Sequence, residues 1–109
     1  MITDRILQLE QFLKDEPEDA FTLYALGLEY ANGGYYLKAK NIFSNLLEIH
    51  PGYLPAYYQF GKLLERLNNT DQAILIYERG IKLAVRKSDS KTLSELKEAY
   101  HSLTGMEED

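Results

Sequence analysis

Few side chains in this 109-residue sequence have the type and spacing that catalysis or metal binding requires. The two histidines, His50 and His101, lie far apart in the sequence, and there is no cysteine. The absence of cysteine excludes disulfides, thiolate catalysis, cysteine-based zinc sites and iron–sulfur clusters. A metal site would need carboxylates from several elements around one isolated histidine. We therefore predict no metal site, no cofactor and no enzymatic activity.

Two further groups of residues resemble chemical sites, and each has a simpler structural explanation. Gly33 and Gly34 have neither the GxGxxG nor the Walker spacing and follow no strand, so they indicate a turn rather than a phosphate-binding loop. Glu16, Glu18 and Asp19 could form an acid–base cluster. Acidic residues are also expected in the first turn of a helix, because they interact favourably with its dipole. We prefer the second explanation.

Composition and charge limit the class of partner. Twelve Lys and Arg against 17 Asp and Glu give a net charge of −5, so the chain has no positive field to attract a nucleic acid. The longest apolar runs are only a few residues, far short of the roughly 20 that a spanning helix needs. The first residues show no basic region followed by an apolar run. We predict a single cytoplasmic domain over residues 1–105 that binds neither nucleic acid nor membrane.

A 34-residue internal repeat is the strongest pattern in the sequence. A shift of 34 positions places Pro17 on Pro51, Gly27 on Gly61, Ala39 on Ala73 and Ile42 on Ile76. Within each copy the apolar residues recur every three or four positions, which is typical of amphipathic helices. Turn residues such as Asn32-Gly33-Gly34 and prolines at 17 and 51 separate the helices. The pattern predicts six helices, over residues 3–15, 20–32, 35–49, 54–67, 71–86 and 91–103.

The repeat resembles the tetratricopeptide repeat (TPR). The first copy has Leu23-x-x-Leu26-Gly27-x-x-Tyr30, then Ala39-x-x-x-Phe43, then Pro51, and the second has Tyr57-x-x-Phe60-Gly61-x-x-Leu64, then Ala73-x-x-x-Tyr77. Leu23 and Tyr57 replace the usual Trp, and Val85 replaces the usual Pro. Without that proline, we expect the fifth helix to continue for another turn.

The resemblance implies an all-α fold in which antiparallel helix-turn-helix repeats stack as a right-handed superhelix. The repeats would occupy residues 20–52 and 54–86, flanked by a half-repeat helix at 3–15 and a capping helix at 91–103. About three repeats are normally needed for stability, so we expect this array to be complete. Residues 106–109 would form an acidic tail.

Gly27 and Gly61 need a tertiary explanation, because glycine inside a helix costs about 1 kcal/mol relative to alanine. We predict that two antiparallel helices approach closely at each glycine, with Ala39 and Ala73 as the matching small residues. Large side chains such as Phe43 and Tyr77 would fill the adjacent space.

The resemblance also implies a binding surface, because the first helix of each TPR lines a concave groove. The candidate groove residues are Phe21, Tyr24, Leu28, Tyr58, Gln59, Lys62 and Arg66. The capping helix would add Ser94, Glu98 and His101. Tyr24 and Tyr58 share one repeat position. The alternative is that these side chains simply pack against the N-terminal helix or fill a shallow superhelix. Some TPR domains clamp carboxylates with Lys, Asn and Arg, but Tyr24, Leu28 and Gln59 stand at those positions, which leaves Lys62 and Arg66 to hold one acidic group.

The sequence therefore predicts a non-catalytic scaffold module that binds a protein or peptide partner in its groove. The alternative is a structural module that self-associates through the apolar strip or a terminal helix, without a peptide ligand. The expected state of the free protein is a monomer or a weak homo-oligomer.

Overall fold

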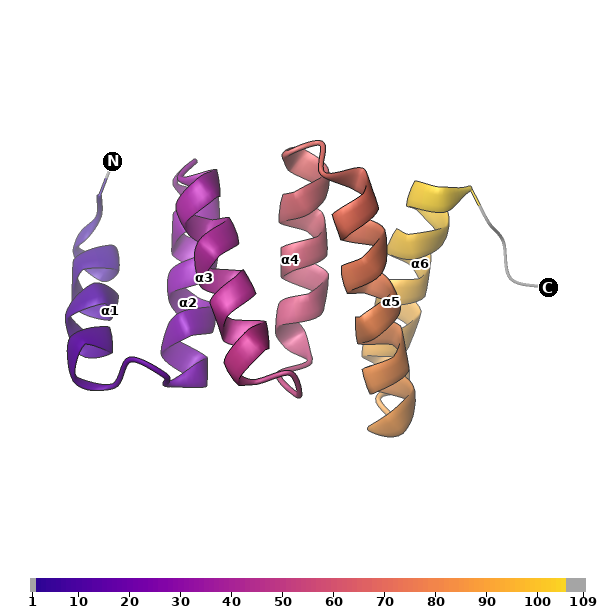
Figure 1. Ribbon diagram of the computed structural model, residues 1–109, viewed down its shortest axis with the longest axis horizontal. Helices are drawn as coiled ribbons and strands as arrows, with labels where there is room; N and C mark the ends of the chain where they lie inside the picture. Colours follow the sequence, from indigo (N-terminus) through magenta and orange to yellow (C-terminus); the bar gives the residue numbers. More distant parts are fainter. Residues whose placement is uncertain (1, 106–109) are drawn as a thin grey trace. The chain divides into compact units, whose positions relative to one another are not determined.

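Six α-helices make up the part of the chain that the structure describes, as the periodicity predicts. The computed structural model describes residues 2–105, which contain no strand. The helices are α1 (Asp4–Asp15), α2 (Ala20–Asn32), α3 (Tyr36–Ile49), α4 (Pro55–Arg66), α5 (Thr70–Arg86) and α6 (Ser90–Thr104) (Figure 1). Every helix end lies within one residue of its expected position. The acidic tail expected at 106–109 lies outside the described residues.

Short polar side chains fix the starts of three helices. Thr3, Asp19 and Asp89 each accept a hydrogen bond from the backbone N–H three residues later, at 3.0–3.1 Å. These bonds satisfy backbone donors that have no partner within the helix. The Thr22 N–H and hydroxyl hold the pKa of Asp19 below its ordinary value. At the other end of the chain, Gly105 ends α6 in the left-handed conformation, with φ 73°.

The turn inside each repeat uses the same left-handed position. Gly34 and Asn68, which are 34 residues apart, have φ values of 83° and 60°. Glycine and asparagine are the residues that adopt this conformation most readily. The repeat therefore extends to backbone conformation, although the two turn sequences differ.

The chain divides into two compact units, Met1–Ala56 and Tyr57–Asp109. We call them the N-terminal and C-terminal units. In each unit the successive helices run antiparallel, α1 to α3 in the first and the rest of α4 to α6 in the second (Figure 1).

In the N-terminal unit, Gly27 lies directly against the ring of Phe43. A methyl group placed on Gly27 would be 2.6 Å from Cε1 of that ring, well inside van der Waals contact. Phe43 and Ala39 are completely buried in α3. The close approach of α2 and α3 that the sequence predicts is therefore confirmed, and it brings the Gly27 backbone against an aromatic ring.

The C-terminal unit repeats this contact and adds another. A methyl group on Gly61 would lie 2.6 Å from Cζ of the buried Tyr77, so α4 and α5 pack as α2 and α3 do. A methyl group on Gly80 would lie 2.7 Å from Cβ of Tyr57 and 3.0 Å from Cδ1 of Leu96. Gly80 thus lets α5 pack against both α4 and α6.

Tyrosine hydroxyl groups connect successive helices. Tyr30 on α2 donates to Glu10 on α1, and Tyr77 on α5 donates to Glu65 on α4. Tyr100 on α6 donates to Glu78 on α5 at 3.2 Å. A charged acceptor makes such bonds stronger than neutral ones. Burial and the neighbouring carboxylate raise the pKa of Tyr30 to about 12 and also raise the pKa of Tyr77.

The fifth helix is longer than its counterpart in the first repeat. α5 has 17 residues and α3 has 14. The additional residues are Ala84, Val85 and Arg86, which align with His50-Pro51-Gly52 in the first copy. The extra turn expected from the replacement of proline by Val85 is therefore confirmed.

Candidate functional site

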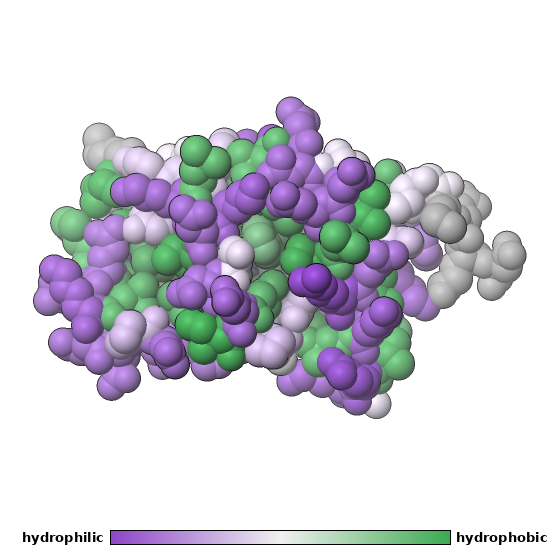
Figure 2. Space-filling view, viewed as in Figure 1, coloured by the Kyte–Doolittle hydropathy of each residue, from purple (hydrophilic) through white to green (hydrophobic). Residues whose placement is uncertain are grey.

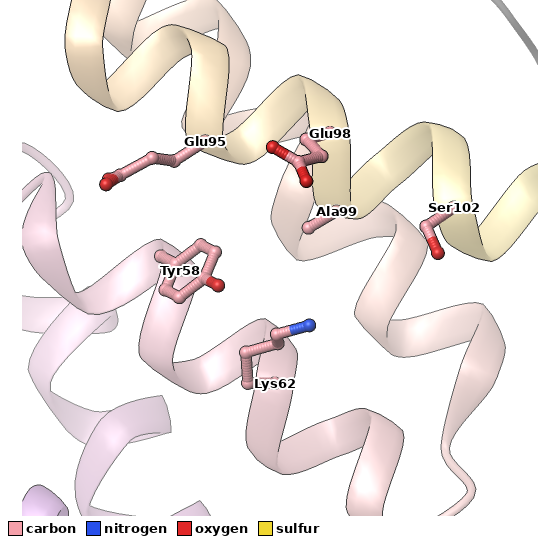
Figure 3. A pocket seen from close by; sticks show the side chains of 6 residues that line it. All are labelled: Tyr58, Lys62, Glu95, Glu98, Ala99 and Ser102. Atoms are coloured by element: carbon pink, nitrogen blue, oxygen red, sulfur yellow. The ribbon is translucent and has the colours of Figure 1, made fainter.

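A cleft between α4 and α6 is the clearest candidate site in the C-terminal unit. It has a volume of about 170 Å³ and is lined by Tyr58, Lys62, Glu95, Glu98, Ala99 and Ser102. In Figure 3, Tyr58 and Lys62 extend from α4 and the other four side chains come from α6. Tyr58 and Lys62 both belong to the candidate residues predicted from the sequence.

Contacts within α4 hold the Lys62 ammonium group. Its Nζ lies 3.8 Å from Oε2 of Glu65 and 5.7 Å from the centre of the Tyr58 ring. Both distances suit weak attractive interactions with a partly exposed cation. Glu65 also accepts the hydrogen bond from Tyr77. Lys62 is thus positioned by its own helix and has a carboxylate partner before any ligand arrives.

The charge of the cleft is set by its α6 wall. Glu95 and Glu98 face one ammonium group, so the lining carries a net negative charge. The hydroxyl groups of Tyr58 and Ser102 can donate or accept hydrogen bonds. A ligand side chain that donates hydrogen bonds or carries positive charge fits this lining better than a carboxylate does.

The candidate residues of the N-terminal unit have different surroundings. Tyr24 is half-buried, with its ring centre 5.3 Å from that of Tyr53 and 6.4 Å from that of Phe43. Phe21 is 63% exposed, and Leu28 is half-buried. Tyr24 therefore contributes to an aromatic cluster of its own unit, whereas the Phe21 side chain is free to meet another molecule.

The remaining candidates, Gln59 and Arg66, do not line the cleft. Gln59 is half-buried, and Arg66 is exposed at the end of α4. On α6, Ser94, Glu98 and His101 are the residues that the resemblance places in the groove, and of these only Glu98 lines the cleft, together with Glu95, Ala99 and Ser102. Their spacing of three, four and seven positions places them on one helix face. This spacing is the feature of the sequence from which the α6 side of the cleft could have been identified.

The acidic residues before α2 take part in structural contacts. Asp19 caps α2, and Nε2 of His50 lies within hydrogen-bonding distance of the Glu18 carbonyl oxygen. Within residues 2–105, no three His, Asp or Glu side chains gather as a metal-binding group. In the same part of the chain, no helix combines the length and apolarity needed to cross a membrane.

Hydrophilic and hydrophobic side chains alternate over the surface. On the face drawn in Figure 2, hydrophilic side chains divide the hydrophobic surface into several patches. Exposed hydrophobic residues occur on separate helices, including Phe12 on α1, Leu37 on α3 and Leu75 on α5. Single exposed apolar residues are normal on soluble proteins.

Comparison with known proteins places the fold in a family. A family model described as tetratricopeptide repeat matches residues 54–84. A TPR domain protein from Salinibacter ruber, solved by crystallography, is 42% identical, with a TM-score of 0.77 over 83% of this chain and 100% of that one.

Two other solved structures share the fold at lower identity. A protein from Bordetella parapertussis is 23% identical, with a TM-score of 0.80, over 95% of this chain and 90% of that one. The TPR2B domain of yeast Sti1, in a complex with pHsp70, is 14% identical, with a TM-score of 0.84, over 92% of this chain and 80% of that one. No curated protein matches. The six helices within residues 2–105, the doubled motif and the 42% identity lead to one conclusion: the chain belongs to the tetratricopeptide repeat family.

Proposed function

We propose that this protein is a non-catalytic module that binds a segment of a partner protein, with the α4–α6 cleft as part of the binding site. The observation that carries the proposal is the cleft itself, where Tyr58 and Lys62 from a repeat's first helix face the α6 side chains. An aromatic ring beside polar groups is a common composition for the centre of a protein interface. The yeast Sti1 domain, which shares the fold, is itself in a complex with pHsp70.

The charge of the cleft indicates which side chains a partner segment would place there. Lys62 already has Glu65 as a partner, and Glu95 and Glu98 add negative charge opposite it. A partner segment that places an arginine, lysine or amide side chain between α4 and α6 would meet these acceptors. Gln59 and Arg66 remain proposed contacts for the rest of the segment. Phe21, Tyr24 and Leu28 remain proposed binding residues of the N-terminal unit.

The experiment is affinity capture from native cell extract, with the bound proteins quantified by mass spectrometry. The wild-type protein is compared with the double variant Tyr58→Ala/Lys62→Ala. We expect the variant to lose its specific partner, because truncation of a central aromatic contact typically costs 2 kcal/mol or more, roughly a 30-fold loss of affinity. A variant that retains the same partner at the same yield would remove the cleft from the site.

Two controls separate binding from folding. Leu37→Ala removes a side chain that is 70% exposed on α3, and it should leave capture unchanged. Tyr58→Phe keeps the ring and removes the hydroxyl, so it distinguishes the aromatic contact from the hydrogen bond. Circular dichroism must show the same helicity for all four proteins.

A further inference from the structure

One face of α5 carries three exposed positive charges. Arg79, Lys82 and Arg86 recur at intervals of three and four, so they form one stripe along the helix. All three side chains are exposed, and none forms an ion pair with another described residue. Leu75, which is 52% exposed, extends the stripe by one turn. We call Leu75, Arg79, Lys82 and Arg86 the basic face.

Charge is distributed unevenly between the two units. Asp and Glu outnumber Lys and Arg by eight to four in the N-terminal unit, whereas the C-terminal unit is nearly balanced, with nine Asp and Glu, three of them at positions 107–109, against eight Lys and Arg. Half of the acidic residues in the N-terminal unit lie within five positions, namely Asp15, Glu16, Glu18 and Asp19. These residues are exposed at the end of α1 and in its connection to α2, and we call residues 15–19 the acidic segment.

We propose that the basic face of one molecule docks on the acidic segment of a second copy. The two surfaces have opposite charge, with three basic side chains on one and four acidic side chains on the other. Each copy therefore offers a surface whose charge complements a surface on another copy. The net charge of −5 opposes long-range attraction to a polyanion such as a nucleic acid or an anionic membrane. It also opposes the approach of a second copy, so the contact depends on the local fields of the two surfaces rather than on net charge. The contact uses charged surfaces, which distinguishes it from self-association through an apolar strip.

Exposed charge pairs produce a contact that is weak and sensitive to salt. Each exposed pair contributes little, and the Debye length shortens from about 14 Å near 0.05 M salt to about 4 Å near 0.5 M. We therefore expect association at high protein concentration and low ionic strength. Because the two contact surfaces differ, the contact can close in a dimer or continue head to tail.

The first experiment measures the weight-average mass by light scattering over a range of protein concentrations. At low salt we expect the mass to rise above 12.6 kDa with concentration, and at high salt to return to that value. A mass of 12.6 kDa at every concentration and salt level would overturn the proposal.

The second experiment reverses the charge of each surface. Arg79→Glu/Lys82→Glu makes the basic face acidic, and Asp15→Lys/Glu16→Lys/Glu18→Lys makes the acidic segment basic while leaving the Asp19 cap intact. Each variant alone should be monomeric, because its two surfaces then carry the same sign. An equimolar mixture should associate again, because each reversed surface meets an opposite charge on the other variant.

The mixture of the two variants tests the pairing of the two surfaces most directly. A mixture that stays monomeric, or a single variant that associates as well as the wild type, would contradict the pairing of these two surfaces. Lys38→Glu/Lys40→Glu changes the net charge by the same amount as the α5 variant but alters α3 instead, so it should retain association. Circular dichroism checks that every variant keeps its helices.

Discussion

At the scale of single residues, the packing depends on glycines that face aromatic rings. Gly27 and Gly61 could be predicted, because the 34-residue repeat aligns them with each other inside helices where glycine is unfavourable. Gly80 has the same role against Tyr57 and Leu96 but aligns with Leu46, so the repeat gave no signal for it. Sequence repetition detects a contact only where both copies make it.

Substitution of Gly61 tests this packing. Gly61→Leu should lower the free energy of unfolding by about 1–3 kcal/mol, because its side chain would overlap the Tyr77 ring and force the helices apart. Urea denaturation measures the change. Gly52→Ala is the matched control, since a methyl group there meets no atom within 4 Å. Equal stability of the Gly61→Leu variant and the wild type would show that Gly61 does not pack closely against the Tyr77 ring.

The raised pKa of Tyr30 makes stability depend on pH in the alkaline range. Its pKa is about 12 in the folded state and 10.0 ordinarily, so ionisation favours the unfolded chain. This contribution is fully present below pH 10 and is lost as the pH rises toward 12. The loss is on the order of 2 kcal/mol. In Tyr30→Phe, unfolding free energies measured from pH 8 to about 12 should fall less steeply than in the wild type, and identical slopes would contradict the assignment.

At the scale of elements, sequence periodicity located all six helices because each buries an amphipathic face. The α4 side of the cleft could be anticipated as well, because Tyr58 and Lys62 occupy groove positions in the repeat. On the α6 side, Glu98 could be anticipated in the same way, whereas Glu95, Ala99 and Ser102 could not, since they do not occupy groove positions in the shifted last copy. Tyr24 illustrates another limit: only the structure reveals its contact with Tyr53, a residue of the α3–α4 connection.

The extra turn of α5 predicts the effect of restoring proline. Val85→Pro should destabilise the protein by about 3 kcal/mol, because proline removes a helical hydrogen bond and clashes with the preceding turn. Ala84, which is completely buried, would lose its packing. Val85→Ala is the control, since Val85 is 57% exposed and its truncation should have little effect. Thermal unfolding followed by circular dichroism distinguishes the two, and a Val85→Pro variant as stable as the wild type would show that the extra turn contributes nothing.

At the scale of the whole molecule, the division into two compact units predicts local rather than uniform responses. Repeat proteins are stabilised mainly by contacts within a repeat and with its neighbours. Gly27→Ala should therefore accelerate amide exchange most strongly in α2 and α3, and Gly61→Ala in α4 and α5. Hydrogen exchange with mass spectrometry measures both patterns. Equal acceleration over residues 2–105 in either variant would instead indicate one fully cooperative unit.

The tyrosine–carboxylate bonds also give the protein a built-in optical probe. The chain has nine tyrosines, four phenylalanines and no tryptophan, so its near-ultraviolet absorbance and emission come mainly from phenol rings. Three of those rings donate to a carboxylate on the preceding helix. Separation of any of these helix pairs would change the environment of a chromophore, so spectroscopy can follow unfolding without an attached dye.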